Sequence, residues 1–281
     1  MSFDVSHPEV VEAVRRALAE DIGTGDLTSE LCVPASTRAT GRMIARAALT
    51  LAGVELLPLV FEQIAPGACS VEILQSSGAR LQPGDVIAVV EGRARALLTG
   101  ERTALNFVQR LSGVATLASA YAREVEGTRC RVLDTRKTTP GLRRLEKMAA
   151  AAGGVNNHRA GLYDAILIKN NHITAAGGVT AALERTRRAG VPVEIEVRTR
   201  VELDEALDWG AKHLLLDNLT PAEAKKWIAH IGGRATVELS GGITLDTARA
   251  YAETGADFVS SGAITHSAPA VDINFRLELK P

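Results

Sequence analysis

The chain has 281 residues, which is enough for one large or two modest domains. Its 32 Lys and Arg residues nearly balance its 33 Asp and Glu residues, and this argues against a nucleic-acid coat or a polybasic membrane binder. The hydrophobic fraction of 46% is that of a packed globular protein, and aromatic residues, at 4%, are too few for a base-stacking surface.

Cysteine usage and the first residues bear on the compartment. The three cysteines, Cys32, Cys69 and Cys130, are far apart and form no CxxC motif, so a disulfide scaffold or a cysteine zinc site is disfavoured. The start, MSFDVSHPEV, lacks the basic and apolar regions of a signal peptide, and no stretch has about 18 uninterrupted apolar residues. We therefore expect a cytoplasmic protein.

The first part of the chain mixes predicted helices and strands. Apolar residues recur at helical spacing over 8–19, where Pro8 suits the first turn of a helix. The segment 20–30 has two glycines and several carboxylates and predicts a loop. The spacing of apolar residues over 99–126 predicts a long amphipathic helix. Extended strands are predicted at 39–48, 69–74 and 86–91.

From residue 130 onward, short apolar strands alternate with helical segments. The predicted strands are 131–134, 165–169, 193–197, 213–217, 236–239 and 257–260. The predicted helices are 177–189, 201–209, 221–230 and 244–254. This alternation is typical of parallel βα units, and six units favour a barrel or near-barrel. A doubly wound sheet is the alternative, and it is weakened because no G-x-G-x-x-G follows the first strand.

Each of these strands ends in charged or small polar residues. In a βα barrel, the carboxyl ends of all strands open onto one face, where active sites are built. A single polar residue at a strand end is often only solvated, but six such ends favour a shared site. The strand-end residues are Thr135, Arg136, Lys137, Lys169, Glu196, Asp217, Asn218, Ser240, Gly241, Gly242, Ser260, Ser261 and Gly262.

The residue types at these ends suit a phosphorylated sugar. Arg136, Lys137, Arg159 and Lys169 supply positive charge, and Arg102 adds to it if the fold brings it close. The glycine turns after two late strands expose backbone N–H groups ahead of helices, as phosphate sites do. The carboxylates of Glu196 and Asp217 can bind ribose hydroxyls or Mg²⁺. No Ser-His-acid or Cys-His arrangement is evident, so covalent hydrolysis is disfavoured.

A set of motifs in a fixed order resembles one known family. The motifs are EDIGTGDLT, ERTALNFVQRLSG, DTRKTTPGLR, NNHRAGLYDAILIKNNH, EIEV, LLDN, SGGIT and GAITHSAPAVDI. In this order they closely resemble quinolinate phosphoribosyltransferase, also called nicotinate-nucleotide pyrophosphorylase (carboxylating). The likeness runs from residue 20 to about residue 272. It implies conversion of quinolinate and phosphoribosyl pyrophosphate to nicotinate mononucleotide, pyrophosphate and CO₂, with Mg²⁺, in NAD biosynthesis.

The resemblance also implies an architecture and an assembly. The expected fold is an N-terminal α/β sandwich-like domain plus an incomplete parallel α/β barrel. On this basis we expect the N-terminal domain at 1–115, with the tail 270–281 returning to it, and the barrel at 116–269. A homodimer or a dimer-based oligomer is expected, in which Arg102 reaches the neighbouring subunit's site.

Site residues follow from the family's motifs, position by position. Quinolinate is expected to be held by Arg102, Arg136, Lys137, His158 and Arg159, and Thr135 is expected to bind substrate. Lys137, Lys169, Glu196 and Asp217 are expected to be catalytic, and Glu196 and Asp217 to contact the phosphoribosyl group and Mg²⁺. The phosphate is expected at Ser240, Gly241, Gly242, Ser261, Gly262 and Ala263.

Three alternatives stay open at this point. A phosphate-binding barrel without catalysis would bind ligand without turnover. A barrel lyase acting on phosphosugars would form an imine at Lys169. The related ModD-like proteins associated with molybdenum transport share the scaffold and differ in substrate.

Overall fold

The computed structural model describes residues 3–279, and the chain divides into two units. The first unit contains the chain up to Ser119, the segment Thr138–Gly154 and the C-terminal stretch from Ile264. The second contains Ala120–Lys137 and Val155–Ala263, so it is an insertion in the first. The predicted boundaries instead gave residues 116–269 to the barrel as one stretch.

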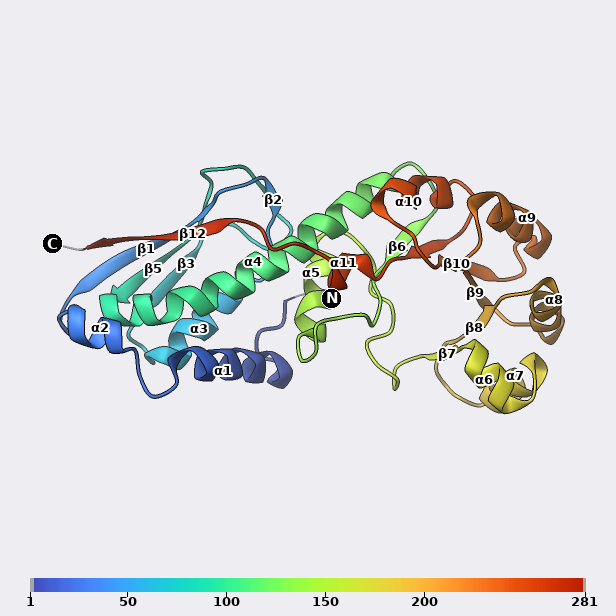
Figure 1. Ribbon diagram of the computed structural model, residues 1–281, viewed down its shortest axis with the longest axis horizontal. Coiled ribbons are helices and arrows are strands. Elements are labelled where there is room, and N and C mark those ends of the chain that lie inside the picture. Colours follow the sequence, from blue (N-terminus) through green and yellow to red (C-terminus); the bar gives the residue numbers. More distant parts are fainter. Residues whose placement is uncertain (1–2, 280–281) are drawn as a thin grey trace. The chain divides into compact units, whose positions relative to one another are not determined.

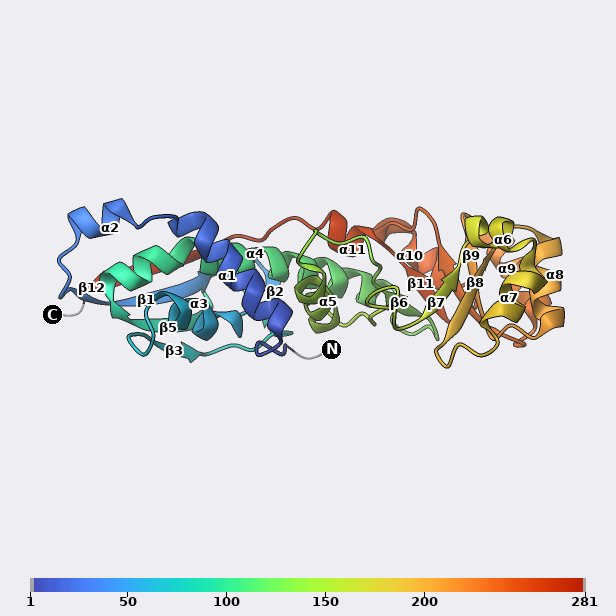
Figure 2. The same cartoon turned by 90° about the horizontal axis from the view of Figure 1, so that it is seen from below.

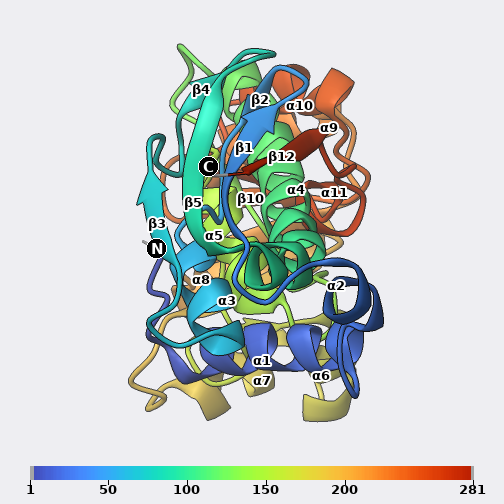
Figure 3. The ribbon, with the colours of Figure 1, turned by 90° about the vertical axis from the view of Figure 1, so that its left-hand side faces the viewer.

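The first unit is built around a four-stranded antiparallel sheet (Figures 1 and 3). Its order is β12 (Ile273–Leu279), β1 (Arg38–Ala45), β5 (Val86–Arg93) and β3 (Ser70–Ile73). The last strand, β12, pairs with β1, so the end of the chain lies in the N-terminal sheet. A separate two-stranded sheet joins β2 (Leu49–Thr50) and β4 (Arg80–Leu81).

Helices cover this sheet, and the first of them begins at a recognisable cap. Helix α1 (Pro8–Ile22) starts at the expected proline, and Nδ1 of His7 accepts a hydrogen bond from the N–H of Glu9. The long helix α4 spans Ala94–Glu124, five residues earlier at its start than predicted. Three further helices of this part are α3 (Leu56–Ile64), which packs on α1, α5 (Arg143–Ala152) and the short α11 (Ala263–His266).

The predicted loop over 20–30 is partly wrong. Residues up to Ile22 belong to α1, and helix α2 covers Leu27–Cys32. Asp26 caps α2, because its carboxylate accepts hydrogen bonds from the N–H of Ser29 and from the hydroxyl of Thr99. An Asp followed three residues later by a serine was the local signal for this helix start.

The second unit contains a six-stranded parallel sheet. Its order is β6-β11-β10-β9-β8-β7. Neighbours therefore follow chain order, except that β6 lies beside the last strand, β11. This circular order is that of a barrel, whereas a doubly wound sheet reverses direction at an internal strand. The bounds are β6 (Arg131–Leu133), β7 (Ile166–Ile168), β8 (Val193–Val197), β9 (His213–Asp217), β10 (Thr236–Ser240) and β11 (Phe258–Ser260).

The barrel of the second unit is incomplete, as predicted. Asn156 forms a parallel bridge with Leu133 and extends the wall beyond β6. Within residues 3–279, no strand pairing joins this segment to β7, so the wall has one gap. The structure confirms the mixed α/β class with an antiparallel N-terminal sheet and a parallel C-terminal sheet.

Helices α6 to α9 lie outside strands β7 to β9 (Figure 2). Helix α6 (Asn170–Ala176) was not predicted. It is capped at its start, where Nδ1 of His172 accepts a hydrogen bond from the N–H of Lys169. The other bounds are α7 (Val179–Thr186), α8 (Arg200–Trp209), α9 (Pro221–Ile231) and α10 (Leu245–Ala252). Over the described residues, no helix has the length and apolarity needed to cross a membrane.

Alternation along the strands decides which side chains face the barrel interior. In β8, Ile195 and Val197 are fully buried and share one face of the strand. Glu194 and Glu196 therefore share the opposite face. In β10, Glu238 is flanked by buried Val237 and Leu239 in the same way. The carboxylates of Glu194, Glu196 and Glu238 therefore lie on the face of the sheet opposite to these buried apolar residues.

Candidate active site at the strand ends

Two predicted catalytic residues meet at the ends of β7 and β8. The Nζ atom of Lys169 lies 3.7 Å from Oε2 of Glu196. The Glu196 side chain is buried, whereas half of the Lys169 side chain is exposed. Asp217 ends the neighbouring strand β9, which is paired with β8 in register. The strand ends therefore gather one cation and two carboxylates.

Two arginines of the second unit are near enough for their charges to interact. Arg136 follows β6, Arg159 follows the bridging segment at Asn156, and both are half-buried. Burial lowers the pKa of Arg159, and the positive charge of Arg136 lowers it further. The charges of Asp164 and Glu194 oppose this shift but do not cancel it. Two half-buried guanidinium groups that repel each other are suited to receive an anion.

The loops after β9 and β10 fit tightly against each other. Asn218 has φ of 58° and its N–H donates to the carbonyl of Ser240. Its side-chain amide donates to Oδ2 of Asp217 at 2.6 Å. Gly241, with φ of +93°, lies so close that a Cβ there would be 2.3 Å from Oδ1 of Asn218. A glycine is therefore required at 241 for two reasons, the backbone conformation and the space.

In the second predicted phosphate loop, residues 261–263 after β11, some polar groups already form hydrogen bonds within the protein. The hydroxyl of Ser261 donates to the carbonyl of Ile243 at 2.8 Å, and its N–H donates to the carbonyl of Leu133. Ser261 is buried, whereas Gly262 and Ala263 are half-buried. The phosphate role of this loop stays a prediction, and Ser261 also ties the end of β11 to β6.

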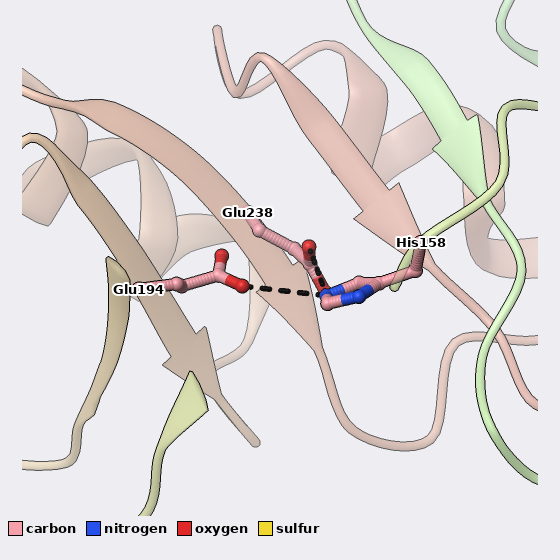
Figure 4. Close-up of side chains that lie close together, drawn as sticks. All are labelled: His158, Glu194 and Glu238. Atoms are coloured by element: carbon pink, nitrogen blue, oxygen red, sulfur yellow. Dashed lines mark ion pairs between the residues drawn. The ribbon is translucent and has the colours of Figure 1, made fainter. Parts of the chain in front are cut away.

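Inside the barrel, two glutamates converge on one ring nitrogen of His158 (Figure 4). Its Nε2 atom is 3.3 Å from Oε2 of Glu194 on β8 and 3.4 Å from Oε2 of Glu238 on β10. These side chains also line a cavity of about 200 Å³ that includes the first residues of β8 to β11. Among the described residues, this is the set of three whose ligand atoms lie close enough to share a metal ion. Both glutamates can accept a hydrogen bond from Nε2 of His158, and one charged imidazole offsets one of their two negative charges.

The two glutamates favour the charged form of the imidazole. Burial lowers the pKa of His158, but the hydrogen bonds to Glu194 and Glu238 and their negative charge outweigh burial and raise it to about 9. The N–H of Arg159 donates to Nδ1 at 2.7 Å, so a second ring proton has to displace it. One such hydrogen bond is worth about 1 kcal/mol, less than the attraction of two buried carboxylates for a cation.

Glu194 and Glu238 are site residues that sequence reasoning missed. The signal was present, because each is an acid inside an otherwise apolar strand and such residues are rarely buried without a partner. Of the predicted residues, fourteen lie in the second unit, and Arg102 alone lies in the first, exposed on α4. Lys137 is exposed and Thr135 is half-buried beside Arg136.

Comparison with known proteins identifies the family. The quinolinate phosphoribosyl transferase N-terminal domain matches residues 26–112, and the C-terminal domain of that family matches residues 114–276. The chain belongs to the quinolinate phosphoribosyltransferase family. The resemblance seen in the motifs is therefore confirmed, and so is the prediction that the chain is an enzyme of this family.

Relatives of this family align over nearly the whole chain. The nicotinate-nucleotide pyrophosphorylase [carboxylating] of Mycobacterium leprae is 42% identical over 285 residues, covering 99% of this chain and all of the relative. A probable enzyme of the same name from Bacillus subtilis is 38% identical and covers 98% of this chain and 96% of its own length. The crystal structure of NadC from Streptococcus pyogenes superposes with a TM-score of 0.94 at 34% identity, with complete coverage of both chains.

The His158 cluster makes stability depend on pH. A histidine with a raised pKa stabilises the fold fully below its unfolded value of 6.5 and loses that contribution as the pH rises through about 9. We expect the free energy of unfolding to fall by about 3 kcal/mol between these limits because of this group. Chemical denaturation from pH 6 to pH 10 measures the fall. In His158→Gln the decline should be clearly smaller; an identical decline in both proteins would contradict the assignment.

The tight fit of Gly241 predicts a specific cost of substitution. Gly241→Ala combines a positive φ with a clash against Asn218, whereas Gly210→Ala has nearly the same φ and nothing within 4 Å of the new Cβ. We expect Gly210→Ala to cost about 1 kcal/mol of stability and Gly241→Ala at least about twice that. Denaturant unfolding of both variants separates backbone strain from the clash. Equal costs would mean that Asn218 moves aside freely.

Proposed function

We propose that this enzyme transfers the phosphoribosyl group of phosphoribosyl pyrophosphate to quinolinate and releases pyrophosphate and CO₂, giving nicotinate mononucleotide for NAD biosynthesis. The observation that carries the proposal is the pair of half-buried, mutually repelling arginines, Arg136 and Arg159. Quinolinate carries two adjacent carboxylates, and a dianion removes this repulsion. Family membership and the names of the relatives support the same reaction.

Quinolinate is bound, in this proposal, by residues after β6 and after Asn156. Each arginine can pair a carboxylate through two parallel N–H···O bonds, which fixes the ring as well as attracting it. Lys137 and Thr135 lie next to Arg136 in sequence and complete the set on that side. The phosphates of the second substrate lie at the turns Ser240–Gly242 and Ser261–Ala263, where backbone N–H groups precede helices.

The reaction needs positioning and charge more than a general base. As pyrophosphate departs, positive charge develops on the ribosyl carbon, and the carboxylates of Glu196 and Asp217 are suited to stabilise it. Lys137 and Lys169 are suited to stabilise the departing anion; the Lys169 ammonium lies 3.7 Å from Glu196 and can turn between the two partners. After attack by the ring nitrogen, the pyridinium withdraws electrons and the adjacent carboxylate leaves as CO₂; the electron pair of the broken bond stays on the ring carbon, which then takes a proton from water.

The donor set is consistent with Mg²⁺, which we propose as cofactor. Glu196 and Asp217 supply carboxylate oxygens from neighbouring strand ends, and Mg²⁺ prefers one or two carboxylates together with substrate phosphates. One oxygen of Asp217 accepts the amide of Asn218, which orients the carboxylate. When bound, the ion supplies charge neutralisation for the leaving pyrophosphate.

We further propose that the protein is a homodimer or a dimer-based oligomer and that it is cytoplasmic. Arg102 is exposed on α4 of the first unit, where it is accessible to a neighbouring subunit. Its part is to pair a quinolinate carboxylate in the neighbour's site. The location is supported by three free cysteines, of which Cys32 is exposed, because free thiols persist in reducing compartments.

The direct test is product formation. Purified protein is incubated with quinolinate, phosphoribosyl pyrophosphate and Mg²⁺, and release of CO₂ and of nicotinate mononucleotide is measured. The proposal requires both products in equal amounts and none when either substrate is left out. Imine trapping by borohydride at Lys169, with no nucleotide formed, would replace the proposal with a lyase.

Arg136→Ala should weaken quinolinate binding. Loss of a bidentate partner for a carboxylate raises the KM for quinolinate by at least about tenfold and leaves the KM for phosphoribosyl pyrophosphate within about threefold. Arg131→Ala, an exposed arginine at the start of β6, is the matched control and should behave as wild type. Steady-state kinetics decide the matter: an unchanged KM for quinolinate in Arg136→Ala would remove Arg136 from the site.

Subunit mixing tests the predicted crossing of Arg102. Arg102→Ala and Lys137→Ala should each be inactive as homodimers, because each breaks both sites. In a mixed dimer one site has both residues intact, so about a quarter of wild-type activity should return after random exchange of subunits. Activity is measured after co-refolding or co-expression. If mixtures stay inactive while the subunits demonstrably exchange, Arg102 acts in its own subunit.

A further inference from the structure

We propose that Tyr121 is a positioning residue for phosphoribosyl pyrophosphate: together with Ser261 it joins the turn after β10 to the turn after β11, so that the two turns hold the phosphates as one site. The inference rests on the proposed function, in which the phosphates lie at residues 240–242 and 261–263. It also gives the Ser261 hydroxyl a different role from the predicted one, because this hydroxyl binds the protein and not the ligand.

The strand pairing between β10 and β11 ends before the two turns begin. In the part of the chain that the structure describes, the last pair of these two strands is Leu239 with Val259. On their other sides the pairing goes further, because β10 stays paired with β9 up to Ser240, and β11 stays paired with β6 up to Ser260. Backbone pairing therefore fixes each turn to its outer neighbour better than it fixes the two turns to each other.

Side chains connect the two turns where the strand pairing has ended. The hydroxyl of Ser261 donates to the carbonyl of Ile243 at 2.8 Å, and the hydroxyl of Tyr121 donates to the same carbonyl at 3.3 Å. The oxygens of the two hydroxyls are 3.2 Å apart. Ile243 directly follows the first turn and Ser261 begins the second, so this cluster of three polar groups joins one turn to the other.

The cluster is closed to solvent, whereas the first turn beside it is open. Tyr121, Ile243 and Ser261 are each at most 5% exposed. A hydrogen bond lost in such a place is poorly replaced by water. Gly242, the residue before Ile243, is exposed, so a ligand can reach the turn while the next residue is fixed. The buried hydroxyl of Tyr121 therefore acts on a ligand through Ile243 and Ser261.

Both hydrogen-bond donors of Ser261 are directed to the protein. Its hydroxyl donates to Ile243, and its N–H donates to the carbonyl of Leu133 at 3.3 Å. A phosphate needs donors, so the side chain of Ser261 places the second turn and does not contact the ligand. Phosphate binding by turns depends on N–H groups that converge on one point, and displacement of one turn by about 1 Å removes that convergence.

Two roles of Tyr121 give different kinetics. If its hydroxyl only provides a partner for a buried carbonyl, its loss lowers the stability of the protein and leaves the KM of both substrates unchanged. If it positions the turns, its loss raises the KM for phosphoribosyl pyrophosphate. The KM for quinolinate then stays the same, because quinolinate is bound, in the proposed function, by residues after β6 and after Asn156.

The experiment compares Tyr121→Phe with Ser112→Ala. Tyr121→Phe removes one oxygen and keeps the ring, and we expect the KM for phosphoribosyl pyrophosphate to rise by about fivefold or more, with the KM for quinolinate within about twofold. Ser112 is fully buried on the same helix, α4, and its hydroxyl accepts the N–H of Ala52 at 2.9 Å. Ser112→Ala should lower stability and leave both KM values within about twofold.

A second variant tests whether Tyr121 acts together with Ser261. Ser261→Ala should raise the KM for phosphoribosyl pyrophosphate to a similar extent, and in the double variant the two effects should not add, because both substitutions break the same connection. Additive effects, or an unchanged KM in Tyr121→Phe, would overturn the inference. A large effect of Ser261→Ala with none of Tyr121→Phe would mean that the serine contacts the phosphate itself.

Failure of the proposed function is recognised separately. If the wild-type protein forms no nicotinate mononucleotide, the function is wrong whatever the variants do. Calorimetric titration with phosphoribosyl pyrophosphate, without quinolinate, needs no turnover, and a Kd that is about fivefold higher in Tyr121→Phe than in wild type would still support the positioning role. If the wild-type protein is active and Tyr121→Phe binds phosphoribosyl pyrophosphate as tightly as wild type does, the positioning role alone is wrong.

Discussion

Electrostatic repulsion between charges of the same sign, held partly out of water, is the constraint on which this site depends. Arg136 and Arg159 share a half-buried place where each disfavours the other. Glu194 and Glu238 form another such pair, and both face Nε2 of His158 inside the barrel. A charged imidazole reduces the repulsion between the two carboxylates, and an anionic ligand would reduce the repulsion between the two arginines.

The parallel strands of the barrel place acidic side chains at different depths. Alternate residues of a strand face the barrel interior, so one strand supplies charges at successive depths. On β8, Glu194 faces His158 and Glu196, two residues further on, faces Lys169. Each carboxylate has a different cation within 4 Å, so neighbouring acids of one strand serve different parts of the site. The helices outside the barrel bury the apolar outer face of the strands, so the functional polar side chains can face the interior.

Much of this fold was predictable because local patterns determined it. The strands at 193–197 and 213–217 have the predicted bounds, since short apolar runs between turns define buried parallel strands well. The Asp26 cap and helix α6 were missed because one polar side chain within a loop-like segment decides each of them. The strand-end residues were foreseen for the same reason as the strands. The partners of His158 were not, because they come from β8 and β10, and only the closed arrangement of the barrel brings these strands to the loop after Asn156.

The pairing of β12 with β1 has a consequence for biosynthesis. The first unit is assembled from three separated stretches, and its sheet gains its edge strand from the last residues of the chain. During translation, the whole inserted barrel leaves the ribosome before that strand does. Until then, one edge of β1 has unpaired backbone groups, which can pair with a strand of another molecule. The order of synthesis therefore favours folding of the barrel before the first unit. A premature stop codon near the end of the gene would give a folded barrel attached to a sheet that lacks its edge strand β12.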